Sequence, residues 1–183
     1  MEINYLNKNI GIIGGDLRIS KLVMLLVEDN YQVHTYALEE AECVNVKQHD
    51  TIETFVESVD IVISGVPLSR DEKTVFAPLS KKIIAIDELL RKLKNKTFIA
   101  GAIKENVYDI AKGNNIEIID MLEKEELTIL NCIPTAEGAL QVAMEESEIT
   151  LHRSNVLVLG YGRIGKILSK MLWRNRSKCV LCC

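Results

Sequence analysis

This sequence of 183 residues lacks several features that would place it in a membrane, outside the cell or on nucleic acid. It has no apolar run long enough to span a bilayer, and its start, Met-Glu-Ile-Asn-Tyr-Leu-Asn-Lys, has no charged-then-apolar secretory pattern. The net charge of −4 does not favour binding to the negatively charged backbone of a nucleic acid. We therefore expect a globular, cytoplasmic protein that binds neither membrane nor nucleic acid.

Residues suited to metal binding or nucleophilic catalysis are also few. Among the five cysteines, Cys182 and Cys183 are adjacent, and no second Cys or His pair lies at the spacing of a zinc site. The three histidines, His34, His49 and His152, have no nucleophile or ligand partner nearby in the sequence. We expect no metal site, and we interpret the histidines as structural.

The strongest positive signal is a glycine-rich elbow near the end of the chain. The apolar run Val156–Leu159 predicts a strand buried on both faces, and Gly160, Gly162 and Gly165 then turn the chain into a helix. We expect Gly160 to permit the turn, Gly162 to admit a pyrophosphate, and Gly165 to let the helix pack closely. A structural turn without a ligand is the simpler alternative. The expected cofactor-binding residues are Gly160, Tyr161, Gly162, Arg163, Ile164 and Gly165.

The rest of the chain alternates between apolar strands and amphipathic helices. Strands are predicted over 9–14, 31–36, 60–66, 82–86, 97–103 and 116–120, and helices over 17–27, 51–58, 87–94, 104–112 and 124–131. This order implies an α/β fold, a flavodoxin- or Rossmann-like doubly wound parallel sheet, followed by the start of a second Rossmann domain. We expect a substrate domain over 1–132, a connector helix within 133–153, and a truncated NAD(P)-binding domain over 154–183.

Two segments carry a resemblance to a known family. The run Asn131–Ala139 (Asn-Cys-Ile-Pro-Thr-Ala-Glu-Gly-Ala), joined at a fixed distance to the glycine elbow, resembles the A subunit of dipicolinate synthase from endospore-forming bacteria. The opening Ile13-Gly14-Gly15-Asp16-x-Arg18 and the pair Val66-Pro67 agree with it. The resemblance extends from the start of the chain to Leu172.

The resemblance implies a two-domain oxidoreductase component, related in architecture to D-2-hydroxyacid dehydrogenases and to the NAD domain of adenosylhomocysteine hydrolases. With the flavoprotein-like B subunit of dipicolinate synthase, the family oxidises dihydrodipicolinate to dipicolinate, using NADP (or NAD), in the mother-cell cytoplasm during sporulation. We also expect an oligomer. Family members continue for roughly another domain beyond the elbow. The resemblance therefore implies a truncated chain with little oxidase activity of its own, whose uncovered apolar faces favour self-association.

A substrate site is expected at the end of the first strand. Arg18, at the front of the first helix, is placed to clamp a carboxylate bidentately, and Gly14, Gly15 and the backbone N–H groups after them are placed to form an anion nest. Asp16 is expected to cap the helix, and Pro67 ends a central strand where open sheets bind ligands. Alternatively, Arg18 is an ordinary surface residue, Gly14 and Gly15 form only a tight turn, and Pro67 marks the entry to a loop.

The connector helix supplies the remaining candidates. Pro134 is expected to open this helix, which places Thr135 and Glu137 in its first turn. The family resemblance favours Glu137 as the base or as a carboxylate that orients the substrate, with Thr135 beside it. Favourable interaction with the helix dipole explains Glu137 equally well. Two other functions stay open: a D-2-hydroxyacid dehydrogenase-like enzyme, and a non-catalytic assembly fragment.

Overall fold

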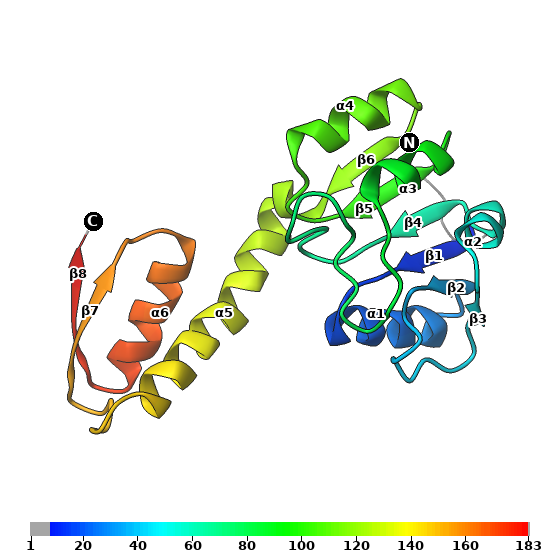
Figure 1. The fold of residues 1–183 in the computed structure, drawn as a ribbon. Helices are drawn as coiled ribbons and strands as arrows, with labels where there is room; N and C mark the ends of the chain where they lie inside the picture. Colours follow the sequence, from blue (N-terminus) through cyan, green and yellow to red (C-terminus); the bar gives the residue numbers. More distant parts are fainter. Residues whose placement is uncertain (1–7, 183) are drawn as a thin grey trace. The chain divides into compact units, whose positions relative to one another are not determined.

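The computed structural model describes residues 8–182, with the backbone alone for 179–182. The chain forms two compact units that divide after Met121. Unit 1 contains the following elements, labelled in Figure 1: β1 (Ile10–Ile13), α1 (Leu17–Glu28), β2 (Val33–Tyr36), β3 (Lys47–Gln48), α2 (Ile52–Ser58), β4 (Ile61–Ile63), α3 (Ile86–Lys92), β5 (Thr97–Ala100), α4 (Glu105–Gly113) and β6 (Glu117–Asp120).

The sheet of unit 1 has six strands in the order β3-β2-β1-β4-β5-β6, and every neighbouring pair is parallel. Adjacent residues of β1 serve two separate cores, because successive side chains of a strand point to opposite faces. Ile12 packs with Ile19 and Val23 of α1, whereas Ile13 packs in the cluster formed with α2, α3 and α4. Helices therefore cover both faces, which confirms the predicted doubly wound α/β fold.

The predicted strand over 82–86 is wrong. This segment makes one isolated antiparallel bridge, between Ala85 and Thr74, and does not join the sheet. Ile84 and Ile86 are buried in the core, but Ile83 between them is 86% exposed. A loop can bury alternate apolar side chains without a full set of strand partners, so the apolar pattern alone was misleading.

Unit 2 contains α5 (Glu125–Glu145), β7 (Asn155–Leu159), α6 (Arg163–Arg174) and β8 (Lys178–Cys182), and the short turn η2 (Met121–Glu123) precedes α5 (Figure 1). Strands β7 and β8 pair in parallel and are connected by α6, as the glycine-rich elbow predicted. However, β7 is not buried on both faces. Val158 is buried, but Leu157 and Leu159 are 59% and 78% exposed, because α6 packs against only one face.

The connector helix is longer than predicted. Helix α5 has 21 residues and begins at Glu125, so Pro134 lies inside the helix instead of opening it. A proline within a helix has no N–H to donate to the carbonyl four residues earlier. Thr135 donates its hydroxyl to the Asn131 carbonyl at 2.8 Å, which satisfies a neighbouring acceptor on the same turn. The boundary expected after Cys132 consequently falls within α5.

Across the part of the chain that the structure describes, every helix is too short or too polar to traverse a lipid bilayer.

Candidate functional site

Two glycines shape the carboxyl end of β1 in unit 1. Gly14 and Gly15 adopt φ values of +58° and +94°, which turn the chain sharply into α1. The Gly14 N–H donates to the Tyr36 carbonyl at 3.1 Å, and the Gly15 N–H donates to the Phe76 carbonyl at 2.7 Å. Both donors are therefore occupied by the backbone. These two N–H groups are therefore not free for an anion, and the predicted nest would depend on the N–H groups that follow Gly15.

Arg18 is held in a fixed position at this turn. Its Nε lies 3.1 and 3.2 Å from the two Asp16 carboxylate oxygens, and its Nη2 lies 2.8 Å from Asp16 Oδ2. Nη2 also donates to the Val66 carbonyl at 2.7 Å. The hydrogen bond from Arg18 is the main reason that the pKa of the Asp16 carboxyl is lowered. Asp16 thus binds one edge of the guanidinium fork that we expected a substrate carboxylate to bind.

The remaining guanidinium nitrogen of Arg18, Nη1, makes no hydrogen bond to another residue within 8–182, and the side chain is 64% exposed. Asp16 also caps α1 by accepting the Arg18 backbone N–H at 3.0 Å, as predicted. One carboxylate therefore both starts the helix and orients the arginine. In the described conformation, Arg18 can bind an anion through Nη1 alone, and a bidentate clamp through Nε and Nη2 requires Asp16 to move away.

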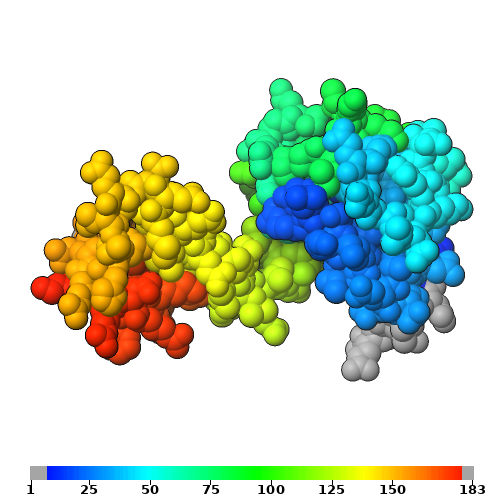
Figure 2. Space-filling model, turned by 90° about the horizontal axis from the view of Figure 1, so that it is seen from below, coloured from blue at the N-terminus to red at the C-terminus, as the bar shows by residue number. Residues whose placement is uncertain are grey.

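The loop after β4 forms the other side of this turn. Ser64, which is buried, donates its hydroxyl to the Ile13 carbonyl at 3.0 Å and so ties the ends of β4 and β1 together. The Val66–Pro67 peptide that follows is cis. Figure 2 shows the early residues of unit 1, in dark blue, against green residues from later in the chain. The structure thus brings Gly14, Gly15, Asp16 and Arg18 together with the loop that contains Pro67.

The glycine elbow of unit 2 has the geometry that the sequence predicted. Gly160 has a φ of +96°, and Gly162 is the N-cap of α6. A Cβ atom on Gly165 would lie 2.1 Å from the Gly160 carbonyl oxygen, so only glycine permits this close approach. A Cβ atom on Gly162 would meet no atom within 4 Å. Open space therefore remains at Gly162, where a pyrophosphate would contact the backbone.

A groove of about 590 Å³ runs along the elbow within unit 2. It is lined by Leu122, Thr128, Asn131, Cys132, Thr135, Val158, Leu159, Gly160, Gly162, Arg163, Ile164, Gly165 and Leu168. Thr135 thus lies in the same groove as the predicted cofactor-binding residues. Glu137 is exposed and is not among the lining residues. Residues two apart on a helix do not share a face, so Thr135 and Glu137 do not form a pair.

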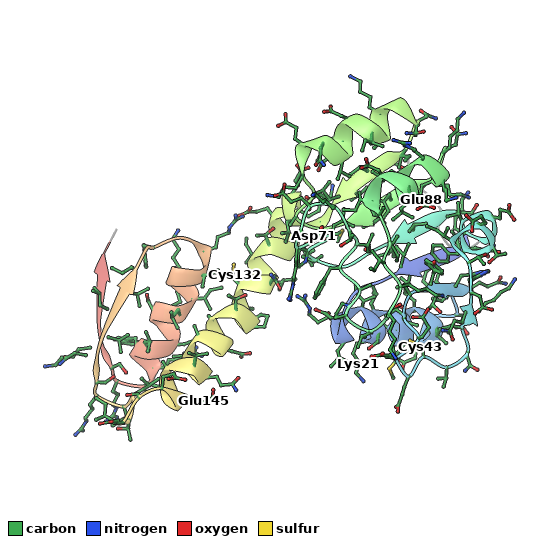
Figure 3. The ribbon with its side chains drawn as sticks, viewed as in Figure 1. Lys21, Cys43, Asp71, Glu88, Cys132 and Glu145 are labelled. Atoms are coloured by element: carbon green, nitrogen blue, oxygen red, sulfur yellow. The ribbon has the colours of Figure 1, made fainter. Side chains whose placement is uncertain are left out.

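Two polar residues that α5 contributes to this groove, Thr128 and Asn131, were not among the predicted site residues, whereas Thr135 was. Thr128, Asn131 and Thr135 all line it, with the buried Cys132, which Figure 3 labels on α5. Their spacing of three to four residues places them on one helix face and was visible in the sequence. A helix start at Pro134, as predicted, separates Thr135 from the residues before it and so hides the shared face.

Charged side chains flank the elbow. Arg163, in the first turn of α6, donates through Nη1 to the Glu125 carboxylate in the first turn of α5. The Lys166 ammonium lies 5.7 Å from the centre of the Tyr161 ring. Both side chains of the Arg163–Glu125 pair are more than half exposed. The arginine predicted to reach a phosphate is therefore already paired with a carboxylate of the chain.

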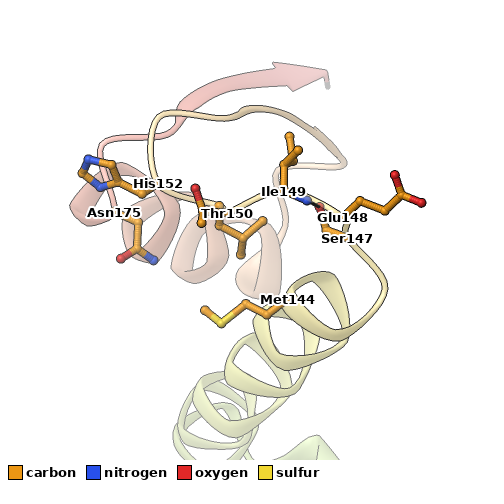
Figure 4. A pocket seen from close by; sticks show the side chains of 8 residues that line it. Met144, Ser147, Glu148, Ile149, Thr150, His152 and Asn175 are labelled. Atoms are coloured by element: carbon orange, nitrogen blue, oxygen red, sulfur yellow. Dashed lines mark hydrogen bonds between the residues drawn. The ribbon is translucent and has the colours of Figure 1, made fainter.

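A second hollow in unit 2, of about 520 Å³, lies where α5 leads into β7 (Figure 4). Met144, Ile149 and Thr150 line it together with His152, which Figure 4 shows near Asn175 at the end of α6. This is the amino end of β7, opposite to the edge at which parallel sheets bind ligands. Among the residues that the structure describes, no group of three or more His, Cys, Asp or Glu side chains could hold a metal ion.

Comparison with known proteins connects the N-terminal part of the chain to a single family. A family model described as the N-terminal domain of the dipicolinate synthase A subunit matches residues 9–122. The A subunit of dipicolinate synthase from Bacillus subtilis (strain 168) is 24% identical over 165 residues, which cover 88% of this chain and 56% of that protein. The chain thus spans a little over half the length of this relative.

Two crystal structures share the fold. The A subunit of dipicolinate synthase from Bacillus halodurans has a TM-score of 0.84 at 23% identity, over 95% of this chain and 61% of that chain. The corresponding polypeptide of dipicolinate synthase from Bacillus subtilis has a TM-score of 0.79 at 21% identity, over 94% of this chain and 59% of that chain.

Proposed function

The chain belongs to the family of dipicolinate synthase A subunits through its N-terminal domain, and on this basis we propose that it is part of a nicotinamide-dependent oxidoreductase that converts dihydrodipicolinate to dipicolinate. The observation that carries the proposal is that one chain joins this family domain, over 9–122, to a glycine elbow with open space at Gly162. By the same proposal it acts with the flavoprotein-like B subunit of the enzyme, in an oligomeric assembly in the mother-cell cytoplasm of a sporulating bacterium.

In this proposal the substrate, a planar diacid, binds at the carboxyl edge of the unit 1 sheet. Arg18 offers one carboxylate its Nη1 group, and the Asp16 and Val66 contacts hold the guanidinium plane in place. A charge-assisted hydrogen bond to a carboxylate contributes roughly 1.5–3 kcal/mol, less at an exposed site. Because Asp16 neutralises much of the charge of Arg18, we expect moderate affinity for a diacid.

The cofactor, NADP or NAD, is proposed to bind at the elbow of unit 2. The residues fit such a group, because the positive end of α6 and the open space at Gly162 suit a pyrophosphate. A bound nicotinamide cofactor would supply the acceptor for the hydride lost from the dihydropyridine ring, and the accompanying proton would pass to solvent. Thr135 and Asn131 line the groove and are proposed to orient polar groups of the cofactor there. Glu137, the predicted base, does not line this groove, and its role as the base stays a prediction.

The substrate site is tested by titrating dipicolinate, the proposed product, into the isotope-labelled chain and following backbone amide shifts. We expect shifts confined to the Gly15–Arg18 and Val66 region, and R18Q should weaken binding roughly tenfold. R91Q is the matched control, because Arg91 is an exposed arginine on α3, away from this turn. Equal affinities for R18Q and R91Q would remove Arg18 from the proposed site.

The family function is tested by adding dihydrodipicolinate, NADP and the B subunit of a related dipicolinate synthase, and measuring dipicolinate formation. Dipicolinate formation that requires the chain supports the proposal. Turnover of a 2-hydroxy acid in its place would favour the dehydrogenase-like alternative. A chain that binds the B subunit but neither dipicolinate nor a nicotinamide cofactor would favour an assembly role.

A further inference from the structure

The ion pair between Arg163 and Glu125 occupies the arginine that lies nearest to the proposed phosphate site. Arg163 lines the elbow groove and is the first residue of α6, directly after the N-cap Gly162. Its Nη1 donates to Oε2 of Glu125, which is the first residue of α5 and lies 38 positions earlier in the chain. Two helix starts are thus joined by one ion pair beside the groove.

Glu125 does not itself line the groove, but it lies between two residues that do. Leu122 and Thr128, which flank Glu125 three residues away on either side, both line the groove with the elbow glycines. A pyrophosphate at the α6 N-terminus would therefore be placed near the Glu125 carboxylate as well as near Arg163. Arg163 attracts an anion at this position and Glu125 repels it. The arginine also cannot give its full set of N–H donors to the carboxylate and to a phosphate at the same time.

From this geometry we propose that Glu125 is an affinity-setting residue of the nucleotide groove, which competes with the ligand's pyrophosphate for Arg163. The inference rests on the proposed nucleotide site and deepens it. In this proposal the Nη1 group of Arg163 exchanges the Glu125 oxygen for a phosphate oxygen when a ligand binds, while the positive end of α6 still attracts the anion. Glu125 therefore weakens binding of any phosphate ligand, and it does so through Arg163.

A purely structural role makes a different prediction. If the ion pair only ties α5 to α6, removing it lowers the stability of unit 2 and leaves anion binding unchanged. Exposed ion pairs contribute little to stability, and both partners here are more than half exposed. Affinity and stability must therefore be measured on the same variants.

The test uses inorganic pyrophosphate as the probe and the full chain as the protein. Affinities are obtained from the backbone amide shifts of Gly162, Arg163 and Ile164, measured for wild type, E125Q, R163Q and the variant that combines both changes. The control is E126Q, which makes the same change in net charge. Glu126 is an exposed neighbour on α5 for which residues 8–182 provide no ion pair. Urea unfolding of each variant reports stability.

We expect E125Q to bind pyrophosphate roughly two- to fivefold more tightly than wild type, which is the range for an exposed ion pair. E126Q should change the affinity for pyrophosphate by no more than about half as much as E125Q does, since only long-range charge is altered. R163Q should bind roughly tenfold more weakly, and E125Q should not improve binding when combined with R163Q.

The outcomes separate the two proposals. If no variant binds pyrophosphate, the nucleotide site itself is wrong and the role of Glu125 is wrong with it. If wild type binds at the elbow but E125Q and E126Q bind equally well, the nucleotide site stands and the inference about Glu125 is overturned. A loss of stability in E125Q without a change in affinity would identify the pair as a structural tie.

Discussion

Replacing Gly165 with alanine tests the close approach on which the elbow depends. The added Cβ atom would lie 2.1 Å from the Gly160 carbonyl oxygen and 3.1 Å from its carbon. Both atoms belong to the backbone, so no change of rotamer relieves the overlap. Because ordinary contacts begin at 3.4 Å, the turn and the helix must separate by about 1.3 Å.

The cost of this separation can be compared with the stability of unit 2. Forcing an extra methyl group into a close-packed site costs about 1–3 kcal/mol, and an immovable carbonyl places Gly165→Ala near the upper end. A domain as small as unit 2, residues 122–183, has a core that supplies only about 3–5 kcal/mol. We therefore expect the variant to leave unit 2 close to unfolding while unit 1 keeps its stability.

Urea unfolding followed by amide hydrogen exchange measures both units in one sample. Protection in α6 should fall steeply in Gly165→Ala, and protection in α1 should not change. Gly138→Ala is the matched control, because Gly138 is a helical glycine of α5 whose Cβ would meet nothing within 4 Å. That change should raise stability by about 0.5–1 kcal/mol. Unchanged protection in α6 of Gly165→Ala would refute the reasoning from the 2.1 Å approach.

Two further predictions concern unit 1. His34 Nδ1 lies 2.9 Å from His49 Nε2 in the core, and burial is the main cause that lowers the pKa of both imidazoles. The unfolded chain then binds more protons below about pH 6.5, so unit 1 should lose stability as the pH falls from about 7.5 to 5.5, and H49Q should flatten this slope in urea unfolding. Asp71, labelled in Figure 3, accepts from the backbone N–H groups of Lys73 and Thr74, which holds its pKa far below the usual value. D71A should therefore abolish exchange protection of those two amides and spare that of the sheet.

The layered architecture was predictable because the repeated signals agree with one another. The apolar residues of β1 and β4, the cap at Asp16 and the glycine that ends α4 each favour the same alternation of strand and helix, and alternating elements leave few topologies. The elbow was predictable for a related reason. Glycine loses more conformational entropy on folding than other residues, so three glycines at fixed spacing indicate a structural requirement. Gly160 adopts a positive φ, and Gly165 allows a close backbone contact.

The errors have a common physical origin in competition between local signals and distant partners. Pro134 is typical of a helix start, but α5 packs against α6 and continues through the proline. The segment 82–86 has an apolar pattern typical of a strand, but its partner is a short loop segment. Neither partner is adjacent in the sequence, so no local rule identifies it.

Residue spacing also could not show that the arginines of the two candidate sites are paired with carboxylates, because the pairing depends on how the chain folds. Arg18 and Arg163 were each expected to offer a free guanidinium to an anion, and the structure pairs each with a carboxylate, Asp16 in one case and Glu125 in the other. The two pairs differ in what they tie together. Asp16 is two residues from its partner and also caps α1, so losing it disturbs the helix, whereas Glu125 has no side-chain capping role at the start of α5. The competing carboxylate at the elbow can therefore be removed without dismantling the site, while the one in unit 1 belongs to the framework that holds Arg18 in place.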